Sequence, residues 1–511
     1  MHKDLATLTN QHTVTCDLCI VGAGAAGISM AMDWLDAGKN VVLLEAGGFE
    51  FDVETQSLNN GTNIGQRYYA LPATRLRFFG GTTMHWGGYC TPLDPIDFEA
   101  RPYVLHSGWP ISFTEFAAFL PAASKMVEID NETWDLDTYI AGKENYTPLD
   151  LNPSVYYSKL FKFSPPTRFG TKYRKALVAS TSITVYTHAN LTDITLDEEG
   201  KVVEKVQAKS LNGNKMTISA NHYVLAMGAI QNARMLLVNN KQHKQGIGNH
   251  NDLVGRYFME HPEVKTGQIF LKRPQSMKLY FFDYTKIKMY SELAIAEAAQ
   301  RAHGILNVTA ALHPKKLSGD WAWINKLPED GKESYDFWVQ AEKQISASPP
   351  SDVDTKKYLA YQMQIRMEQS PNPNSRITLD SKKDKLGIAE PILNWQLTEL
   401  ERNSIKDMHT LLGKELIQSD VGRLHAPEWV FDTSLEWPAT LGGGWHHLGT
   451  TRMHNDPKKG VVDANCTIHG INNLHVAGSS CFTTAGAANP TLSLIALTLR
   501  LSKHLKQLIT K

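Results

Sequence analysis

An apolar segment followed by three closely spaced glycines near the start of the chain limits its possible fold more than any other feature. Residues 18–21 are apolar, Gly22, Gly24 and Gly27 follow with the spacing G-x-G-x-x-G, and residues 25–37 are compatible with a helix. Strand, glycine turn and helix in this order predict a βαβ unit that binds a dinucleotide. There the first glycine makes the tight turn, the second admits a pyrophosphate, and the third lets helix and strand pack closely.

The start of the predicted helix is where we expect the pyrophosphate. Free backbone N–H groups and the helix dipole favour an anion at a helix N-terminus, so we expect Ala25 and Ala26 to lie against the cofactor with the glycines. A second apolar segment, 41–44, ends at Glu45. A carboxylate here accepts hydrogen bonds from a ribose hydroxyl and disfavours a 2′-phosphate, so FAD or NAD is favoured over NADP.

Length and charge exclude several classes of protein. A chain of 511 residues is too long for one compact core, so two domains are expected. Lys+Arg and Asp+Glu number 52 each, and such a balance predicts no binding to nucleic acid. We expect no membrane span and, because the N-terminal residues lack an apolar signal segment, a cytoplasmic protein. Five cysteines are too few and too odd in number for a disulfide framework.

Alternating strand and helix patterns occur at both ends of the chain, whereas the middle is aromatic-rich and irregular. The patterns predict a helix over 111–127 and a hairpin over 191–211. We therefore expect an α/β fold, α+β overall, with a Rossmann-like dinucleotide-binding domain that is discontinuous in sequence. That domain would comprise residues 14–100, 165–264 and 436–508. An inserted substrate domain would comprise residues 101–164 and 265–435.

Five segments, in order, resemble the glucose–methanol–choline (GMC) family of FAD-dependent oxidoreductases. They are GAGAAG with Glu45, GGTTMHWGG at 80–88, LAMGAIQNARMLL at 225–237, GIGNHNDLVGRYFMEHP at 246–262, and HHLGTTRM with AGAANPTLSLIAL at 446–453 and 485–497. Within the family, the chain most resembles the group of pyranose 2-oxidase and bacterial fructose, gluconate and glucoside dehydrogenase subunits. The resemblance implies an FAD-binding Rossmann-like domain with a sheet-based substrate domain over the flavin.

Oxidation of an alcohol by a flavin moves a hydride to flavin N5 and requires a base for the hydroxyl proton. Histidine is suited to this task because much of it is neutral at working pH. In the family the base stands in H-x-x-G-T, which corresponds to His446, and a second residue, His or Asn, corresponds to Asn489. His447 is expected to pack elsewhere, because adjacent side chains rarely point the same way. His261, in the fourth segment, is expected to be structural.

The resemblance also implies further FAD contacts. His85 matches the histidine that carries FAD covalently in pyranose 2-oxidase, or else lines the flavin edge without a bond. The glycines around it, Gly81 among them, fit a backbone that passes close to a planar ring. The remaining implied contacts are Leu191 at the adenine, Gly478 and Ser479 at the ribityl–phosphate chain, and Pro490 and Thr491 at the flavin.

The leading functional hypothesis is oxidation of a sugar or glycoside hydroxyl to a ketone or lactone. A non-sugar alcohol as substrate, or a lyase of the same fold without net redox chemistry, are the alternatives. The electron acceptor would be O₂ or a quinone or cytochrome partner. By analogy, a small accessory subunit could accompany the chain and export it to the periplasm, which is the alternative to a cytoplasmic location.

Overall fold

The structure is a computed structural model and describes residues 1–129, 133–273, 275–283, 288–315 and 359–509. Its first eight-stranded sheet carries the predicted βαβ unit. The strands, in spatial order, are β1 (His2–Asp4), β7 (Ile183–Thr187), β3 (Val41–Leu44), β2 (His12–Val21), β10 (Lys215–Leu225), β9 (Val203–Lys209) and β8 (Asn190–Leu196), with β19 (Leu474–Val476) beside β10. Neighbours from β1 to β10 run parallel, as do β10 and β19, whereas β8 and β9 form the predicted antiparallel hairpin.

The glycine turn after β2 leads into α1 (Ala25–Asp33). Gly22 has a φ of +104°, and a Cβ on Gly27 would lie 1.8 Å from the Gly22 carbonyl oxygen, so both positions require glycine. The prediction that the helix continues to residue 37 was wrong. The chain leaves the helix at Trp34, whose N–H bonds to the Ala31 carbonyl at 3.1 Å.

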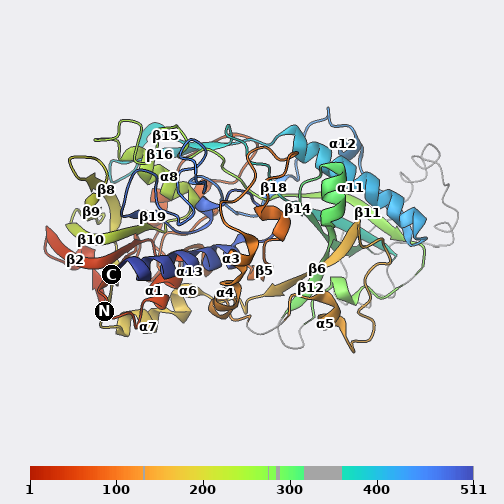
Figure 1. Ribbon diagram of the computed structural model, residues 1–511, viewed down its shortest axis with the longest axis horizontal. Helices are drawn as coiled ribbons and strands as arrows, with labels where there is room; N and C mark the ends of the chain where they lie inside the picture. The colour runs from red at the N-terminus through yellow and green to blue at the C-terminus, as the bar shows by residue number, and fades with distance from the viewer. Residues whose placement is uncertain (130–132, 274, 284–287, 316–358, 510–511) are drawn as a thin grey trace.

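The last helix, α13 (Pro490–Ile509), returns the chain to its beginning. It lies beside α1, and the two termini lie at the same end of the molecule (Figure 1). The Trp34 indole N–H donates to the hydroxyl of Ser502 on α13 at 2.9 Å, within one large hydrophobic core. The first and last segments of the chain therefore build one unit together.

A second eight-stranded sheet lies at the other end of the molecule, and each of its strand pairings is antiparallel (Figure 1). Its strands are β17 (Gly422–His425), β11 (Pro262–Leu271), β14 (Ala360–Met367), β13 (Val308–Lys315), β12 (Met289–Ile295), β6 (Tyr156–Phe163) and β5 (Tyr89–Cys90), with β18 (Gly442–Gly443) beside β11. The long helix α11 (Glu399–Gln418) packs on this sheet through Ile405, Met408 and Leu412, which share its hydrophobic core.

A small third sheet joins segments that are distant in sequence. In it, β16 (Ala389–Trp395) pairs antiparallel with β15 (Arg376–Lys383) and parallel with β4 (Thr62–Gly65). Helix α8 (Ala229–Val238) is fixed to this region by Arg234, whose guanidinium forms a buried ion pair with Asp384 at 2.6 Å. The proposed division into two domains at the residues given above stays a prediction.

The helix predicted over 111–127 was wrong, because two short helices, α3 (Phe113–Ala117) and α4 (Leu120–Met126), stand there. Pro121 is the second residue of α4 and has no N–H to continue the hydrogen-bond ladder of the first helix. Further short helices are α2 (Val53–Gln56), α5 (Leu136–Ile140), α6 (Phe169–Lys172), α7 (Arg174–Ala179), α9 (Glu297–His303) and α12 (Glu428–Phe431).

Two predictions about composition can be compared with the structure. All five cysteines are buried and free, in agreement with the absence of a disulfide framework. Among the residues that the structure describes, none of the helices combines the length and the apolar character needed to cross a membrane.

Candidate active site

A single cavity brings together almost all of the residues that the sequence singles out. Gly27 is the exception, since it packs inside the βαβ unit. The cavity is lined by Gly22, Gly24, Ala25, Ala26, Glu45, Gly81, His85, Leu191, His446, Gly478, Ser479, Asn489, Pro490 and Thr491. These residues come from the two ends and the middle of the chain, and the first sheet with its helices gathers them.

The dinucleotide end of the cavity is formed by the turn between β2 and α1. A Cβ on Gly24 would have no protein atom within 4 Å, and one on Gly81 would lie 3.1 Å from the Gly24 Cα. No side chain therefore covers the backbone at these glycines, as the close approach of a pyrophosphate requires. Glu45 is buried, which raises the pKa of its carboxyl group, and its oxygens accept the N–H groups of Ala23 and Gly47 at 2.9 and 3.0 Å.

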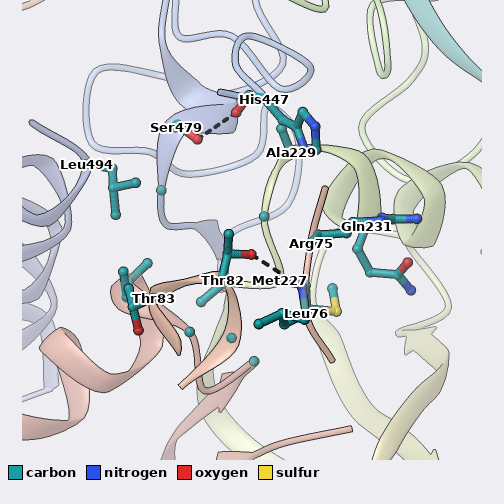
Figure 2. Close-up of a pocket in the computed structure, with 18 of the residues that line it drawn as sticks. Arg75, Leu76, Thr82, Thr83, Met227, Ala229, Gln231, His447, Ser479 and Leu494 are labelled. Atoms are coloured by element: carbon teal, nitrogen blue, oxygen red, sulfur yellow. Dashed lines mark hydrogen bonds between the residues drawn. The ribbon is translucent and has the colours of Figure 1, made fainter. Parts of the chain in front are cut away.

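Several buried polar atoms of the cavity wall have no hydrogen-bond partner among the described residues. They are Nε and Nη1 of Arg75, Nε2 of His85, Oε1 of Gln231 and Oδ1 of Asn489. Figure 2 shows Arg75 and Gln231 on one side of the cavity, with Thr83 and Leu494 on the other. Because buried polar groups in proteins are nearly always paired, these atoms indicate a polar ligand. The residues present therefore fit FAD.

The catalytic candidates lie side by side. His446 stands in the loop after β18, and Asn489 immediately precedes the first residue of α13. The Asn489 amide nitrogen lies 3.3 Å from His446 Nε2, and His446 Nδ1 lies 2.9 Å from Nδ1 of His261. His446 Nε2 and the Asn489 amide thus lie next to each other at the wall of the cavity. The glycine turn between β2 and α1 lines the same cavity.

Glu260 holds the loop of His446 in place. Its carboxylate, which is fully buried, accepts the backbone N–H groups of His261 and His446, both at 2.8 Å, and the Tyr68 hydroxyl at 2.5 Å. His447 lines the same cavity as His446, but it has a different partner: its Nε2 lies 3.0 Å from the Tyr68 oxygen. Its carbonyl accepts the Ser479 hydroxyl at 2.7 Å (Figure 2).

Burial keeps the histidines of the site neutral. It lowers the pKa of His261 to about 4 and that of His447 to about 3. It also lowers the pKa of His446 far below its ordinary value, and the neighbouring His261 adds to the effect. Burial raises the pKa of Glu260 to about 7. A neutral imidazole can accept a proton, so His446 can act as a base.

Donor atoms of Glu260, His261 and His446 lie within 4.8 Å of one another, close enough in principle to hold a metal ion. The atoms concerned already form the hydrogen bonds described above, which account for their geometry. We therefore assign no metal to this cluster.

Aromatic side chains form the wall of the cavity near His85. The Trp445 ring lies 5.4 Å from the His85 ring and 5.8 Å from the ring of Tyr69. Trp445 lines the cavity and is 38% exposed, whereas Tyr69, which is 41% exposed, lies outside the cavity lining. Burial, and then the charge of Arg168, lower the pKa of His85, which favours its neutral form.

Sequence reasoning missed several residues of the site. Tyr68 and Arg75 carry no motif of their own, and Glu260 lies in the fourth family segment without having been singled out, so only their contacts reveal these residues. Trp445 has a partial signal, because it adjoins His446. His261 was expected to be structural, yet its ring contacts that of His446.

Comparison with known families matches residues 17–246 to the FAD dependent oxidoreductases and residues 371–498 to the GMC oxidoreductases. The 2-methyl-1,2-propanediol dehydrogenase of Mycolicibacterium austroafricanum is 23% identical over 96% of this chain and 95% of that protein. The fructose dehydrogenase large subunit of Gluconobacter japonicus is 22% identical over 96% and 98%. The structure of pyridoxine 4-oxidase from Mesorbium loti superposes with a TM-score of 0.57 at 15% identity, covering 96% of this chain and 99% of that one.

Proposed function

Because this chain belongs to the GMC family and is an FAD-dependent oxidoreductase, we propose that it oxidises a hydroxyl group of a sugar or glycoside to a ketone or lactone. The observation that carries the proposal is the pair formed by His446 Nε2 and the Asn489 amide, 3.3 Å apart, in the cavity lined by the dinucleotide turn. FAD, when bound, supplies the acceptor for the hydride that leaves the carbinol carbon.

His446 is the base in this proposal. Its Nε2 accepts the proton of the substrate hydroxyl, which makes the hydride easier to release from the same carbon. Asn489 supplies an amide that holds the substrate oxygen without titrating, and its Oδ1 has no partner among the described residues. The proton therefore moves from the substrate oxygen to His446 Nε2.

The backbone of the β2–α1 turn, together with Glu45, Gly81, Leu191, Gly478, Ser479, Pro490 and Thr491, would hold FAD. We propose that His85 also ties the flavin covalently. Its support is the buried Nε2, which lines the cavity and has no partner in the described part of the chain. A covalent bond would prevent loss of the cofactor.

A sugar is favoured as substrate by two observations. The Trp445 ring at the cavity wall offers an apolar face on which a pyranose ring can stack, and one relative acts on fructose by its name. A non-sugar alcohol is the second candidate, because another relative is named for 2-methyl-1,2-propanediol. The electron acceptor would be O₂ or a quinone or cytochrome partner, and the fructose dehydrogenase relative, itself a large subunit, motivates an accessory subunit for this chain as well.

The test is anaerobic mixing of the flavin-loaded protein with aldoses, ketoses, glycosides and simple alcohols, while the visible absorbance of the flavin is followed. Bleaching by a sugar supports the proposal, and bleaching only by simple alcohols supports the second candidate. If no compound bleaches the flavin but a cyanohydrin is cleaved, the protein is a lyase. Admission of air to the reduced protein then distinguishes an oxidase from a dehydrogenase.

His446→Gln is the matched variant, because it retains a polar side chain of similar reach but removes the basic nitrogen. We expect it to retain FAD and to bleach at least about 100-fold more slowly. A variant that bleaches at the wild-type rate would remove His446 from the mechanism.

A further inference from the structure

Three hydrogen bonds in series run from the cavity into the interior. The Asn489 amide nitrogen lies 3.3 Å from His446 Nε2, His446 Nδ1 lies 2.9 Å from His261 Nδ1, and His261 Nε2 lies 2.9 Å from the Gly486 carbonyl oxygen. Both ends of the series have a defined direction: an amide nitrogen only donates, and a carbonyl oxygen only accepts.

This direction determines where each proton lies. The Gly486 carbonyl requires the proton of His261 to be on Nε2, which leaves Nδ1 of this neutral ring as an acceptor. His446 must then donate from Nδ1, and its Nε2 is left with a lone pair that accepts the Asn489 amide N–H at the cavity wall. The hydrogen bond at the cavity end of the series leads to the same conclusion. Because the Asn489 amide N–H donates to His446 Nε2, the proton of His446 must be on Nδ1.

We propose that His261 is a positioning residue, which fixes His446 in the tautomer that carries its proton on Nδ1 and leaves Nε2 unprotonated, so that Nε2 can act as the base. This inference rests on the proposed function. Without an acceptor at His261, the tautomer with the proton on Nε2 becomes accessible, and in that tautomer the nitrogen that faces the substrate cannot take a proton.

The surroundings of His261 suit this task. It precedes β11, its ring is fully buried, and its backbone N–H is held by Glu260. The charge of Arg366 disfavours a second proton on the ring, which adds to the effect of burial on its pKa.

The series also ends without an outlet. The Gly486 carbonyl cannot pass a proton on, so a proton accepted by His446 has no route through His261 into the interior. It must leave from Nε2 through the cavity. His261 therefore determines which nitrogen of His446 accepts the proton, but it does not pass that proton on.

The test is ¹⁵N NMR of the imidazoles in the flavin-loaded protein at neutral pH, with the His446 signals assigned by their loss in His446→Gln. We expect the proton on Nδ1 of His446 in the wild-type protein. His261→Leu removes the acceptor and should move the proton, wholly or in part, to Nε2. His261→Asn places an amide oxygen near the original Nδ1 and should restore it. A His446 tautomer that is unchanged in His261→Leu, or a wild-type proton on Nε2, overturns the proposal.

Kinetics provide a second readout, with the fastest-reacting compound of the panel as the probe. The bleaching rate should fall about 10- to 100-fold in His261→Leu and recover in His261→Asn. In the His446→Gln background, His261→Leu should cause no further loss. If His446→Gln bleaches normally, the proposed function fails while the tautomer result stands. If His446 is needed but His261→Leu is kinetically normal, only the positioning role fails.

Discussion

The Glu260 carboxylate accepts the backbone N–H of His446 through a hydrogen bond of 2.8 Å, across 186 positions of sequence. This bond joins the segment just before β11 to the loop of the proposed base. Because the same carboxylate also accepts the His261 N–H, one buried group sets the positions of both rings. The position of the proposed base therefore depends on a residue that does not line the cavity.

Glu260→Ala should lower both stability and turnover. It leaves two buried backbone N–H groups and the Tyr68 hydroxyl without their acceptor, at a cost of roughly 1–3 kcal/mol for each group that stays unpaired. Glu260→Gln is the matched control, because its amide oxygen can still accept the two N–H groups. We expect the thermal midpoint and the bleaching rate of the Gln variant to lie much closer to wild type. Equal losses in both variants would show that the negative charge matters more than the hydrogen bonds.

The pH dependence of flavin bleaching should reflect the buried state of His446. The active form of the base is neutral, so activity is lost as pH falls through the pKa of His446. Burial, and then His261, place this pKa far below the ordinary 6.5, and the acid limb of kcat/KM should follow it. Stopped-flow bleaching from about pH 5 to pH 8 should therefore show no loss of activity near the ordinary histidine pKa. An acid midpoint at or above the ordinary histidine pKa contradicts this assignment, provided that activity returns at neutral pH.

The parts of the site encoded locally were predictable from the sequence. The glycine spacing predicted the β2–α1 turn because the positive φ of Gly22 and the close approach of Gly27 to the Gly22 carbonyl are local features. His446 and Asn489 were identified only through their resemblance to family motifs, and the structure brings them to one wall.

The remaining parts depend on contacts between distant segments. The bond of Glu260 to the His446 N–H and the contact of His447 with Tyr68 arise only when the segments of β11, β18 and Tyr68 are brought together. The break between α3 and α4 had a local signal in Pro121, but the apolar periodicity of 111–127 concealed it.

The proposed bond between His85 and the flavin can be tested without a substrate. Acid precipitation of the wild-type protein should leave the yellow colour in the pellet, and His85→Ala should release it into the supernatant. The Ala variant should still bind FAD before precipitation, because the β2–α1 turn remains. If flavin leaves the wild-type protein on precipitation, His85 only lines the cavity.

Substitutions of Gly24 and Gly27, two glycines of one motif, should affect cofactor binding and folding separately. A Cβ on Gly24 meets no protein atom within 4 Å but projects where the backbone approaches the cofactor, whereas a Cβ on Gly27 would lie 1.8 Å from the Gly22 carbonyl oxygen. Gly24→Ala should therefore leave the thermal midpoint of the flavin-free protein nearly unchanged and weaken FAD binding about tenfold or more, which a titration by flavin fluorescence measures. Gly27→Ala should lower that midpoint by several degrees, because the strand and helix must separate. Unchanged FAD affinity in Gly24→Ala would mean that the pyrophosphate does not approach this turn.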